Sequence, residues 1–462
     1  MVAHKDATLA QCLEAVSAVV GAPGCGALKP AVDIILERFA KDTSTPLRLV
    51  EILLSAEAQS ASREVEAVVL DMVRNEKVLE LFTKGYPASK QDCKSMYTLL
   101  WNLGTQHFLG KDYPACVGAY TAALPYADAD AKPRVGRQLA LAHLALHQLD
   151  RSLEALDAAA EYDPSSVFTT FVRIKVLLTQ GNAAGALDLL RPLMACEGFD
   201  LDFLRVVVVE ASSAAMLPVA KQALQLLWEE TLKSPRGAQD KPGNDAVIAQ
   251  NLIRLMTEMS ENYNLELGRC RPGKEEHAPA APGAAGDSVQ CALAKESIHQ
   301  ELAGLFSQAK DRLEAVGAAT FFGTDLPSWF ALASFNAGLA AMGAKDVVAA
   351  AVLFKASGDF YEAYTGPTAQ TLAVQRKAYT LATSCTLAEH DRRPDHKPCL
   401  SLAQALLRKG YASLEAAAQQ PAAEQDILVA KKELLTLVRL HIPDTCHICA
   451  EHRCLLEVPL WV

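Results

Sequence analysis

The sequence predicts an all-α solenoid of stacked helical hairpins, and three observations support this. Apolar residues recur at steps of three and four through most of the chain, which is the period of an amphipathic helix. Half of the 462 residues are hydrophobic but only 6% are aromatic, and alanine and leucine dominate, which favours helix over sheet. Paired helices joined by tight turns also recur at a nearly constant interval, as in repeat proteins.

Residues 1–90 are expected to form a helical segment that is either a cap or a set of degenerate repeats. Apolar periodicity predicts helices over residues 7–20, 31–39, 43–56 and 63–82. The first of these helices ends at Gly21-Ala-Pro-Gly24, because glycine and proline terminate helices. This motif follows a helix rather than a strand and lacks the spacing of a dinucleotide-binding loop. It therefore indicates helix termination.

The sharpest hairpin lies between Leu99 and Ala123. Its two apolar stripes flank a tight turn at residues 110–113. Five positions match the tetratricopeptide pattern of small residue, aromatic, small residue, aromatic and small residue: Gly104, His107, Cys116, Tyr120 and Ala123. A single hairpin cannot bury its own apolar face, so neighbouring hairpins are required.

Two further hairpins follow at the expected interval. Ala140 stands 36 residues after Gly104, and Ile174 stands 34 residues after Ala140. Turns are predicted at residues 147–150 and 181–182. A fourth helix pair, over residues 204–214 and 218–232, keeps the helical period but lacks the turn signature. These features assign a tetratricopeptide array to residues 91–264.

The second half of the chain repeats the first after an interruption. Proline, glycine and alanine without apolar periodicity predict a flexible loop over 265–287. A second array is expected over 288–441, where Asn336-Ala337-Gly338 corresponds to Asn102-Leu103-Gly104, and Lys345-Asp346 to Lys111-Asp112. Its last helices are predicted at 368–388, 400–418 and 424–441. Residues 442–462 are a divergent tail.

Composition and motifs exclude several classes of function. The formal net charge of −10 argues against a broad basic surface for nucleic acid. No stretch approaches the roughly 20 apolar residues that cross a bilayer, and twelve mostly scattered cysteines are typical of reduced thiols. We therefore expect a soluble intracellular protein. Phosphate-loop and nucleophile-elbow motifs are absent from the sequence, which predicts no enzyme activity, no cofactor and no small-molecule substrate.

Two groups of residues have the spacing of metal ligands. The tail places Cys446, Cys449, His452 and Cys454 within nine residues, where four ligands could hold Zn²⁺. Structural zinc sites usually draw their second ligand pair from further along the chain, so the alternative is an incidental tail. His143 and His147 lie one helical turn apart, but His143 occupies an inward position where a packed or hydrogen-bonded histidine is expected. We predict no metal site.

The motifs of the hairpin at Leu99–Ala123 and of its counterpart in the second array resemble those of the meiosis-specific tetratricopeptide scaffold family of the Zip-four or Spo-twenty-two type. The resemblance is carried by Leu99-Leu100-Trp101-Asn102, by Lys111-Asp112-Tyr113, and by Trp329-Phe330 far downstream. It covers roughly residues 60–440, although this chain is shorter than a typical member and its tail does not match. The resemblance implies a scaffold in meiotic crossover formation and chromosome synapsis, located in the nucleus on chromosomes and acting through protein partners.

A partner-binding groove is expected on the first helix of each hairpin, which lines the concave face of such arrays. The predicted groove residues are Trp101, Thr105, Phe108, Arg137, Leu141, Leu144, Phe335 and Met342. Trp101 has a second interpretation as a core residue. The alternative function is a generic peptide-binding adaptor, such as a cochaperone or an assembly-complex subunit. A third is a regulatory domain of a larger enzyme, whose catalytic part this chain does not supply.

Overall fold

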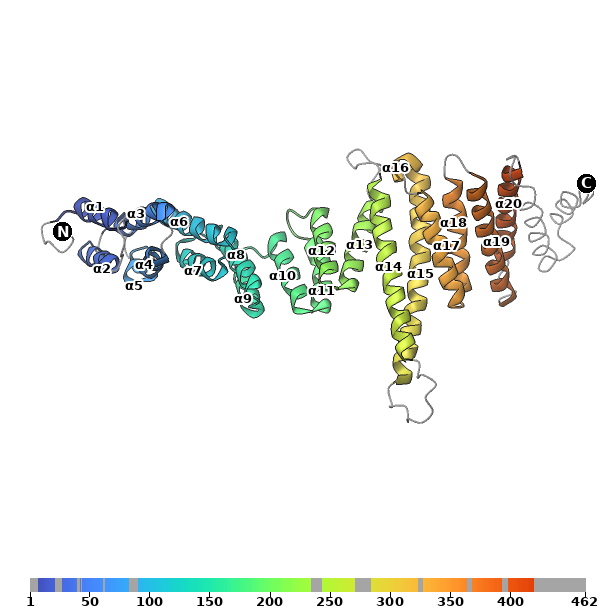
Figure 1. Cartoon of the computed structure of the whole chain (residues 1–462), viewed down its shortest axis with the longest axis horizontal. Coiled ribbons are helices and arrows are strands. Elements are labelled where there is room, and N and C mark those ends of the chain that lie inside the picture. The colour runs from blue at the N-terminus through green and yellow to red at the C-terminus, as the bar shows by residue number, and fades with distance from the viewer. Residues whose placement is uncertain are drawn as a thin grey trace, which may run out of the picture. The chain divides into compact units, whose positions relative to one another are not determined.

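The computed structural model describes residues 7–20, 27–39, 42, 44–60, 63–82, 90–233, 243–270, 284–322, 327–363, 368–392 and 398–418. Every regular element in these ranges is a helix, and most helices form antiparallel pairs (Figure 1). The chain divides into two compact units, residues 1–220 and 221–462. The predicted fold class, a tetratricopeptide-like all-α solenoid, is confirmed.

The first unit begins with a bundle of short helices and continues as a ladder of hairpins. The bundle comprises α1 (Leu9–Val20), α2 (Leu28–Arg38), α3 (Ser44–Ser60), α4 (Arg63–Arg74) and α5 (Glu76–Glu80). The hairpins pair α6 (Lys90–Leu109) with α7 (Tyr113–Ala123), α8 (Lys132–Ala145) with α9 (Leu149–Tyr162), and α10 (Val167–Gln180) with α11 (Ala183–Met194). A fourth turn connects α12 (Leu201–Ser213) to α13 (Leu217–Lys233), and the boundary between the two units falls within α13, after Ala220.

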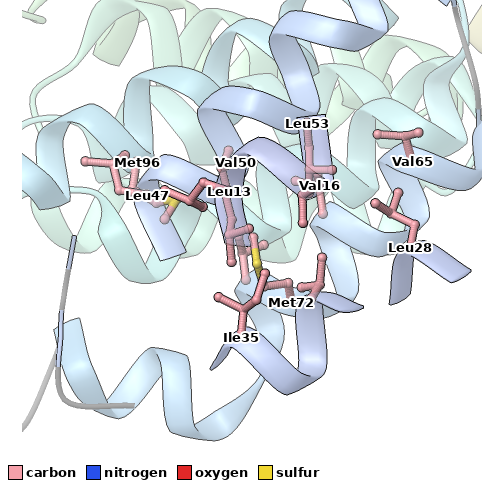
Figure 2. Packing of buried hydrophobic residues seen from close by; sticks show 14 of the residues in the cluster. Leu13, Val16, Leu28, Ile35, Leu47, Val50, Leu53, Val65, Met72 and Met96 are labelled. Atoms are coloured by element: carbon pink, nitrogen blue, oxygen red, sulfur yellow. The ribbon is translucent and has the colours of Figure 1, made fainter. Parts of the chain in front are cut away.

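One apolar core holds the N-terminal bundle to the first hairpin. Figure 2 shows side chains from several helices meeting in a shared interior, among them Val16 of α1, Ile35 of α2, Val50 of α3, Met72 of α4 and Met96 of α6. Each of these five side chains is at most 4% exposed. Burial of this kind contributes roughly 1.5–3 kcal/mol per large side chain. The bundle therefore shares one apolar core with the first hairpin.

The single helix predicted over residues 63–82 is wrong, because the chain breaks at Asn75. Asn75 has extended backbone angles (φ −60°, ψ 130°), and its side chain accepts a hydrogen bond from the backbone N–H of Lys77. Asparagine is a favourable N-cap because its side-chain oxygen replaces a missing helical acceptor. Periodicity could not reveal this break, since Met72 and Val78 are buried on both sides of it.

Four successive turns between helices in the first unit share one geometry. The turn residue has a left-handed backbone in each, with φ between 56° and 78°: Lys111, His147, Gly181 and Ala215. In each turn the next residue's N–H donates to the carbonyl four residues before the turn residue, over 2.8–2.9 Å. Ala215 lies 34 residues after Gly181. The fourth pair therefore has the same turn although its sequence lacks the turn signature, because an alanine occupies the position that glycine has at Gly181.

The second unit contains a long hairpin followed by two shorter ones. The long pair is α14 (Asn244–Cys270) and α15 (Ala284–Val316), which lie side by side in Figure 1, followed by the short α16 (Ala318–Phe322). The others are α17 (Pro327–Gly343) with α18 (Val347–Glu362), and α19 (Ala369–Arg392) with α20 (Pro398–Ala418). Lys345 has the same left-handed turn geometry between α17 and α18 (φ 66°), as the correspondence with Lys111 predicts.

The interruption between the two predicted arrays is shorter than the sequence indicated. Residues 265–270 belong to α14, and residues 284–287 belong to α15, so the bounds 265–287 for a loop are wrong at both ends. Leucine, glutamate and arginine in 265–270 and alanine in 284–285 are good helix formers, so they support helix even without an apolar stripe. Residues 271–283, the predicted helix 424–441 and the tail 442–462 lie outside the described residues. The division into 1–90, 91–264 and 288–441 stays a prediction.

Candidate partner-binding groove

The left-handed turn residues align the hairpins and reveal which side chains occupy equivalent positions. In each pair of the first unit, we compare the residue that lies ten positions before the turn residue, on the first helix of the pair. Aromatic and arginine side chains alternate at this position: Trp101, Arg137, Phe171 and Arg205. The first helices α8, α10 and α12 pack in succession. These side chains therefore form a row across the face of the first helices, which we call the first-helix groove.

A cavity of about 830 Å³ opens in this groove between α6, α8 and α10. Its walls combine aromatic side chains with arginines: Trp101, Tyr162 and Phe168 with Arg134 and Arg137. Phe168 is 58% exposed and Tyr162 is 49% exposed, which is unusual for large aromatic side chains. Asp130, Asp163 and Glu197 also line the cavity, so both signs of charge are present at its wall.

Arg137 connects α8 to the beginning of α10. Its Nη1 lies 3.2 Å from Ser166 Oγ, 3.2 Å from Thr169 Oγ1 and 3.4 Å from Asp163 Oδ2. The guanidinium carbon also lies 6.0 Å from the centre of the Phe168 ring, within range of a cation–π interaction. The Arg137 side chain is only 15% exposed. Arg137 therefore positions the wall of the cavity, whereas the exposed Arg134 presents its charge to solvent.

Trp101 belongs to both the core and the groove. Its ring packs at 5.2 Å from Tyr120 and 5.9 Å from Tyr97, and it is half-buried. The same side chain lines the cavity. Burial of the neighbouring Tyr97 and Tyr120 hydroxyls raises the pKa of both groups, so this part of the wall stays uncharged near neutral pH.

The other predicted groove residues of the first unit differ in their accessibility. Thr105 is half-buried and donates its hydroxyl to the carbonyl of Trp101 over 2.9 Å. Phe108 is half-buried and packs edge-on against Tyr113 with ring centres 5.7 Å apart. Leu141 packs against the core between α8 and α10. None of these three lines the 830 Å³ cavity, so their role toward a partner stays a prediction.

Leu144 is a core residue, and its assignment to the groove is wrong. It is 8% exposed and belongs to a buried cluster with Ala140, Leu156 and Val176. The reason is geometric, because a residue near the end of α8 faces the adjacent α10 rather than solvent. Its equivalent Leu178 is also buried, at 4% exposure.

Phe335 and Met342 lie on α17 of the second unit. Phe335 stands ten residues before the left-handed Lys345, which makes it the equivalent of Trp101. Its ring packs edge-on against Phe354 at 5.4 Å, just as Trp101 packs against Tyr120. Met342 is 40% exposed. These two residues therefore belong to a surface of the second unit and not to the cavity described above.

The sequence analysis missed several groove residues, namely Arg134, Tyr162, Phe168, Phe171 and Arg205. Phe168 and Phe171 both contact Phe203 of α12 edge-on, at 5.6 and 5.7 Å. Arg205 forms an ion pair with Asp202 on its own helix. Counting back a fixed number of residues from each predicted turn would have found Phe171. It would not have found Arg205, because the turn at Ala215 carries no glycine or asparagine.

The described part of the chain offers no metal centre and no membrane-spanning helix. No three histidine, cysteine, aspartate or glutamate side chains in these ranges come together as metal ligands. His143 bonds through Nδ1 to Gln148 Oε1 over 2.9 Å, which confirms the hydrogen-bonded interpretation of that residue. Cys446, Cys449, His452 and Cys454 lie outside the described residues. Among the described helices, none has the length and apolar character needed to cross a bilayer.

Comparison with solved structures finds matches at low identity and low TM-score. No family model matches the chain. A tetratricopeptide repeat protein from Parabacteroides merdae is 11% identical, with 72% of this chain and 99% of that chain covered and a TM-score of 0.29. Yeast Tom70 is 12% identical (79% and 95% covered, TM-score 0.23). Naa15/Naa10 bound to HypK is 14% identical (97% and 71% covered, TM-score 0.31). At these TM-scores the likenesses say nothing of what the chain binds.

Proposed function

We propose that this chain is a non-enzymatic scaffold whose first-helix groove binds a segment of a partner protein. The observation that carries the proposal is the 830 Å³ cavity lined by Trp101, Arg134 and Phe168. Aromatic and arginine side chains supply most of the binding energy at protein interfaces, and exposed ones at the wall of a cavity are suited to anchor a partner. The partner's side chains would insert between the rings of Trp101, Tyr162 and Phe168.

The biological setting we propose is meiotic crossover formation and chromosome synapsis, in the nucleus and on chromosomes. Its support is the resemblance of Leu99–Asn102, Lys111–Tyr113 and Trp329-Phe330 to the meiotic scaffold family. The structure adds that Trp101 lines the cavity.

The test is affinity purification of the full chain from cells in meiosis, in wild-type form and as Arg134→Glu/Phe168→Ala. Both side chains are exposed, so the substitutions leave the core unchanged. The matched control is Leu109→Ala, which alters a side chain that is 77% exposed and lies outside the cavity. We expect crossover and synapsis proteins with the wild type and the control, and their loss with the groove variant.

Two results would contradict this proposal. Equal recovery of the same proteins with the groove variant would remove the groove from their recognition. Recovery of chaperones alone would favour the alternative, a generic peptide-binding adaptor. Disruption of the gene tests the biological setting separately, because an unchanged number of chiasmata would exclude a role in crossover formation.

A further inference from the structure

The second unit contains a separate groove that the proposed function does not use. Helices α14 and α17 form its walls, and α15, which packs against both, forms its floor. The floor residues His299 and Leu302 are 1% and 2% exposed. The cavity measures about 320 Å³, at the small end of the range of binding cavities. It is open to solvent along the wall formed by α17, where Leu332 is 52% exposed.

The α17 wall combines small side chains along the cavity with a stripe of exposed apolar side chains. Ala333, Ala337 and Ala340 line the cavity at helical spacing, so another backbone can approach this wall closely. Leu339 and Met342 continue the stripe beyond Leu332, at 42% and 40% exposure. Large apolar side chains that line up on one helix face mark an interaction site more often than scattered ones do.

The charges at the groove lie at its two ends and have opposite sign. Both are carried by α14, on which Arg254 and Glu261 are exposed. The Arg254 guanidinium lies 5.3 Å from the ring centre of Trp329 across the groove, and Glu261 lines the cavity. Seven residues of helix separate the two charges by about 10.5 Å along the axis. An occupant that satisfies both must therefore carry an acidic and a basic group about two helical turns apart.

The backbone chemistry of the walls decides what form the occupant takes. Helical walls have used their own N–H and C=O groups in internal hydrogen bonds, so they cannot pair with an extended strand. An occupant helix satisfies its own backbone groups and presents an apolar face at positions i, i+3, i+4 and i+7. We propose that the groove between α14 and α17 binds an amphipathic helix of a partner protein. The acidic side chain of that helix lies at Arg254, and its basic side chain lies at Glu261.

Fluorescent synthetic helices tested against the full chain can probe this proposal directly. Four peptides share one leucine stripe and differ only at two flanking positions two turns apart, which carry Glu and Lys, Glu and Glu, Lys and Lys, or Gln and Gln. We expect the Glu/Lys peptide to bind about three- to tenfold more tightly than the other three, because two exposed ion pairs contribute modestly. A fifth peptide, the Glu/Lys sequence with a central proline, is expected to lose binding because proline breaks the helix.

Charge reversal in the protein sharpens the test. Glu261→Lys places two cations at the groove, so the preferred peptide should change from Glu/Lys to Glu/Glu. The matched control is Glu258→Lys, which makes the same charge change on an exposed α14 residue that does not line the cavity. It should leave the order of affinities unchanged. Leu332→Asp should abolish binding of every peptide, whereas Leu402→Asp, at another exposed position on α20 (40%), should not.

Four outcomes overturn the proposal. Equal binding of the proline-containing peptide would show that the occupant is not a helix. An unchanged Glu/Lys preference in Glu261→Lys, or the same change in Glu258→Lys, would exclude recognition by the paired charges. Failure of all the helical peptides to bind would exclude this occupant altogether. None of these results bears on the first-helix groove of the other unit, whose test uses different residues.

Discussion

The ring of Tyr120 on α7 packs directly against the backbone of Gly104 on the paired helix α6, in the space that a side chain at Gly104 would occupy. A Cβ at Gly104 would lie 2.7 Å from Tyr120 Cε1, and one at Gly338 would lie 2.8 Å from Phe354 Cδ1. Both pairs are 16 residues apart. The similarity of the two sequence units is therefore a similarity of packing, since in each a missing side chain on the first helix admits an aromatic ring from the second.

Substitution of Gly104 by alanine should destabilise the first unit by about 1–3 kcal/mol. The methyl group would overlap the buried Tyr120 ring, and overpacking of a dense core forces shifts that cost this amount. The matched control is Gly118→Ala on α7, where a Cβ would meet Leu70 at an ordinary 3.5 Å. That change should be neutral or slightly stabilising, because alanine favours helix. Chemical denaturation of the two variants checks the difference, and equal stability would contradict the packing argument.

The left-handed turns predict opposite effects on stability for two substitutions. Ala215→Gly should stabilise the fourth hairpin by up to about 1 kcal/mol, because a left-handed backbone (φ 56°) strains alanine but not glycine. Gly181→Ala should cost about 1 kcal/mol for the same reason (φ 78°). The control, Ala214→Gly, changes the adjacent residue, whose φ is −83°, and should only destabilise. Thermal unfolding measures all three. A gain from Ala214→Gly as large as that from Ala215→Gly would contradict the assignment.

A buried aspartate predicts acid sensitivity of the second unit. The Asp359 side chain is 2% exposed and accepts hydrogen bonds from Lys355 and Tyr379 at 2.9 Å and from Lys409 at 2.7 Å. Burial alone would raise the pKa of this carboxyl group, but the hydrogen bonds from Lys409 and Lys355 outweigh it and lower the pKa. Its contribution to stability is therefore fully present above about pH 5 and is lost as the pH falls through the lowered pKa.

Asp359→Asn should accordingly cost about 3 kcal/mol near neutral pH, because it removes the buried counter-charge of the half-buried Lys355 and Lys409. The variant should also lose less stability on acidification than the wild type. The control, Glu362→Gln, removes an exposed carboxylate that also pairs with Lys409, and should cost less than about 1 kcal/mol. Denaturation followed between pH 7 and about pH 3 gives both quantities. Parallel pH profiles for Asp359→Asn and wild type would contradict the assignment.

Substitution of the two arginines of the cavity should affect the stability of the first unit differently. Arg137→Met should destabilise the first unit by about 1–3 kcal/mol, because it leaves the buried hydroxyls of Ser166 and Thr169 without this donor. Arg134→Met changes an exposed side chain and should alter stability by less than about 0.5 kcal/mol. Urea unfolding of the two variants measures this difference. Equal losses would show that Arg134 also has a structural role.

The fold was predictable because helical hairpins are encoded locally. The period of the apolar stripe can be recognised from the local sequence alone, and so can the turn residues Gly181 and Asn182. The fourth turn and the break at Asn75 were missed for the opposite reason. Ala215 adopts its left-handed backbone at a turn that no glycine or asparagine marks, and Asn75 caps a helix within an otherwise continuous apolar pattern.

The groove was only partly predictable, since burial depends on neighbouring helices. Trp101 and Arg137 were found through their equivalent positions, and both line the cavity. The sequence around Leu144 does not distinguish a buried leucine from an exposed one. Leu144 is a core residue only because it contacts the next hairpin. Tyr162 and Phe168 escaped notice because one ends a second helix and the other begins a first helix, outside the expected stripe.

Site-specific photocrosslinking tests the central claim, that the first-helix groove receives a partner, most directly. A benzophenone amino acid would replace Phe168, which lines the cavity, or Leu109, which is exposed elsewhere on the first unit. We predict that irradiation of the full chain in extracts of meiotic cells links crossover and synapsis proteins to position 168 and not to position 109. The same crosslinked proteins at both positions, or none at position 168, would contradict the account.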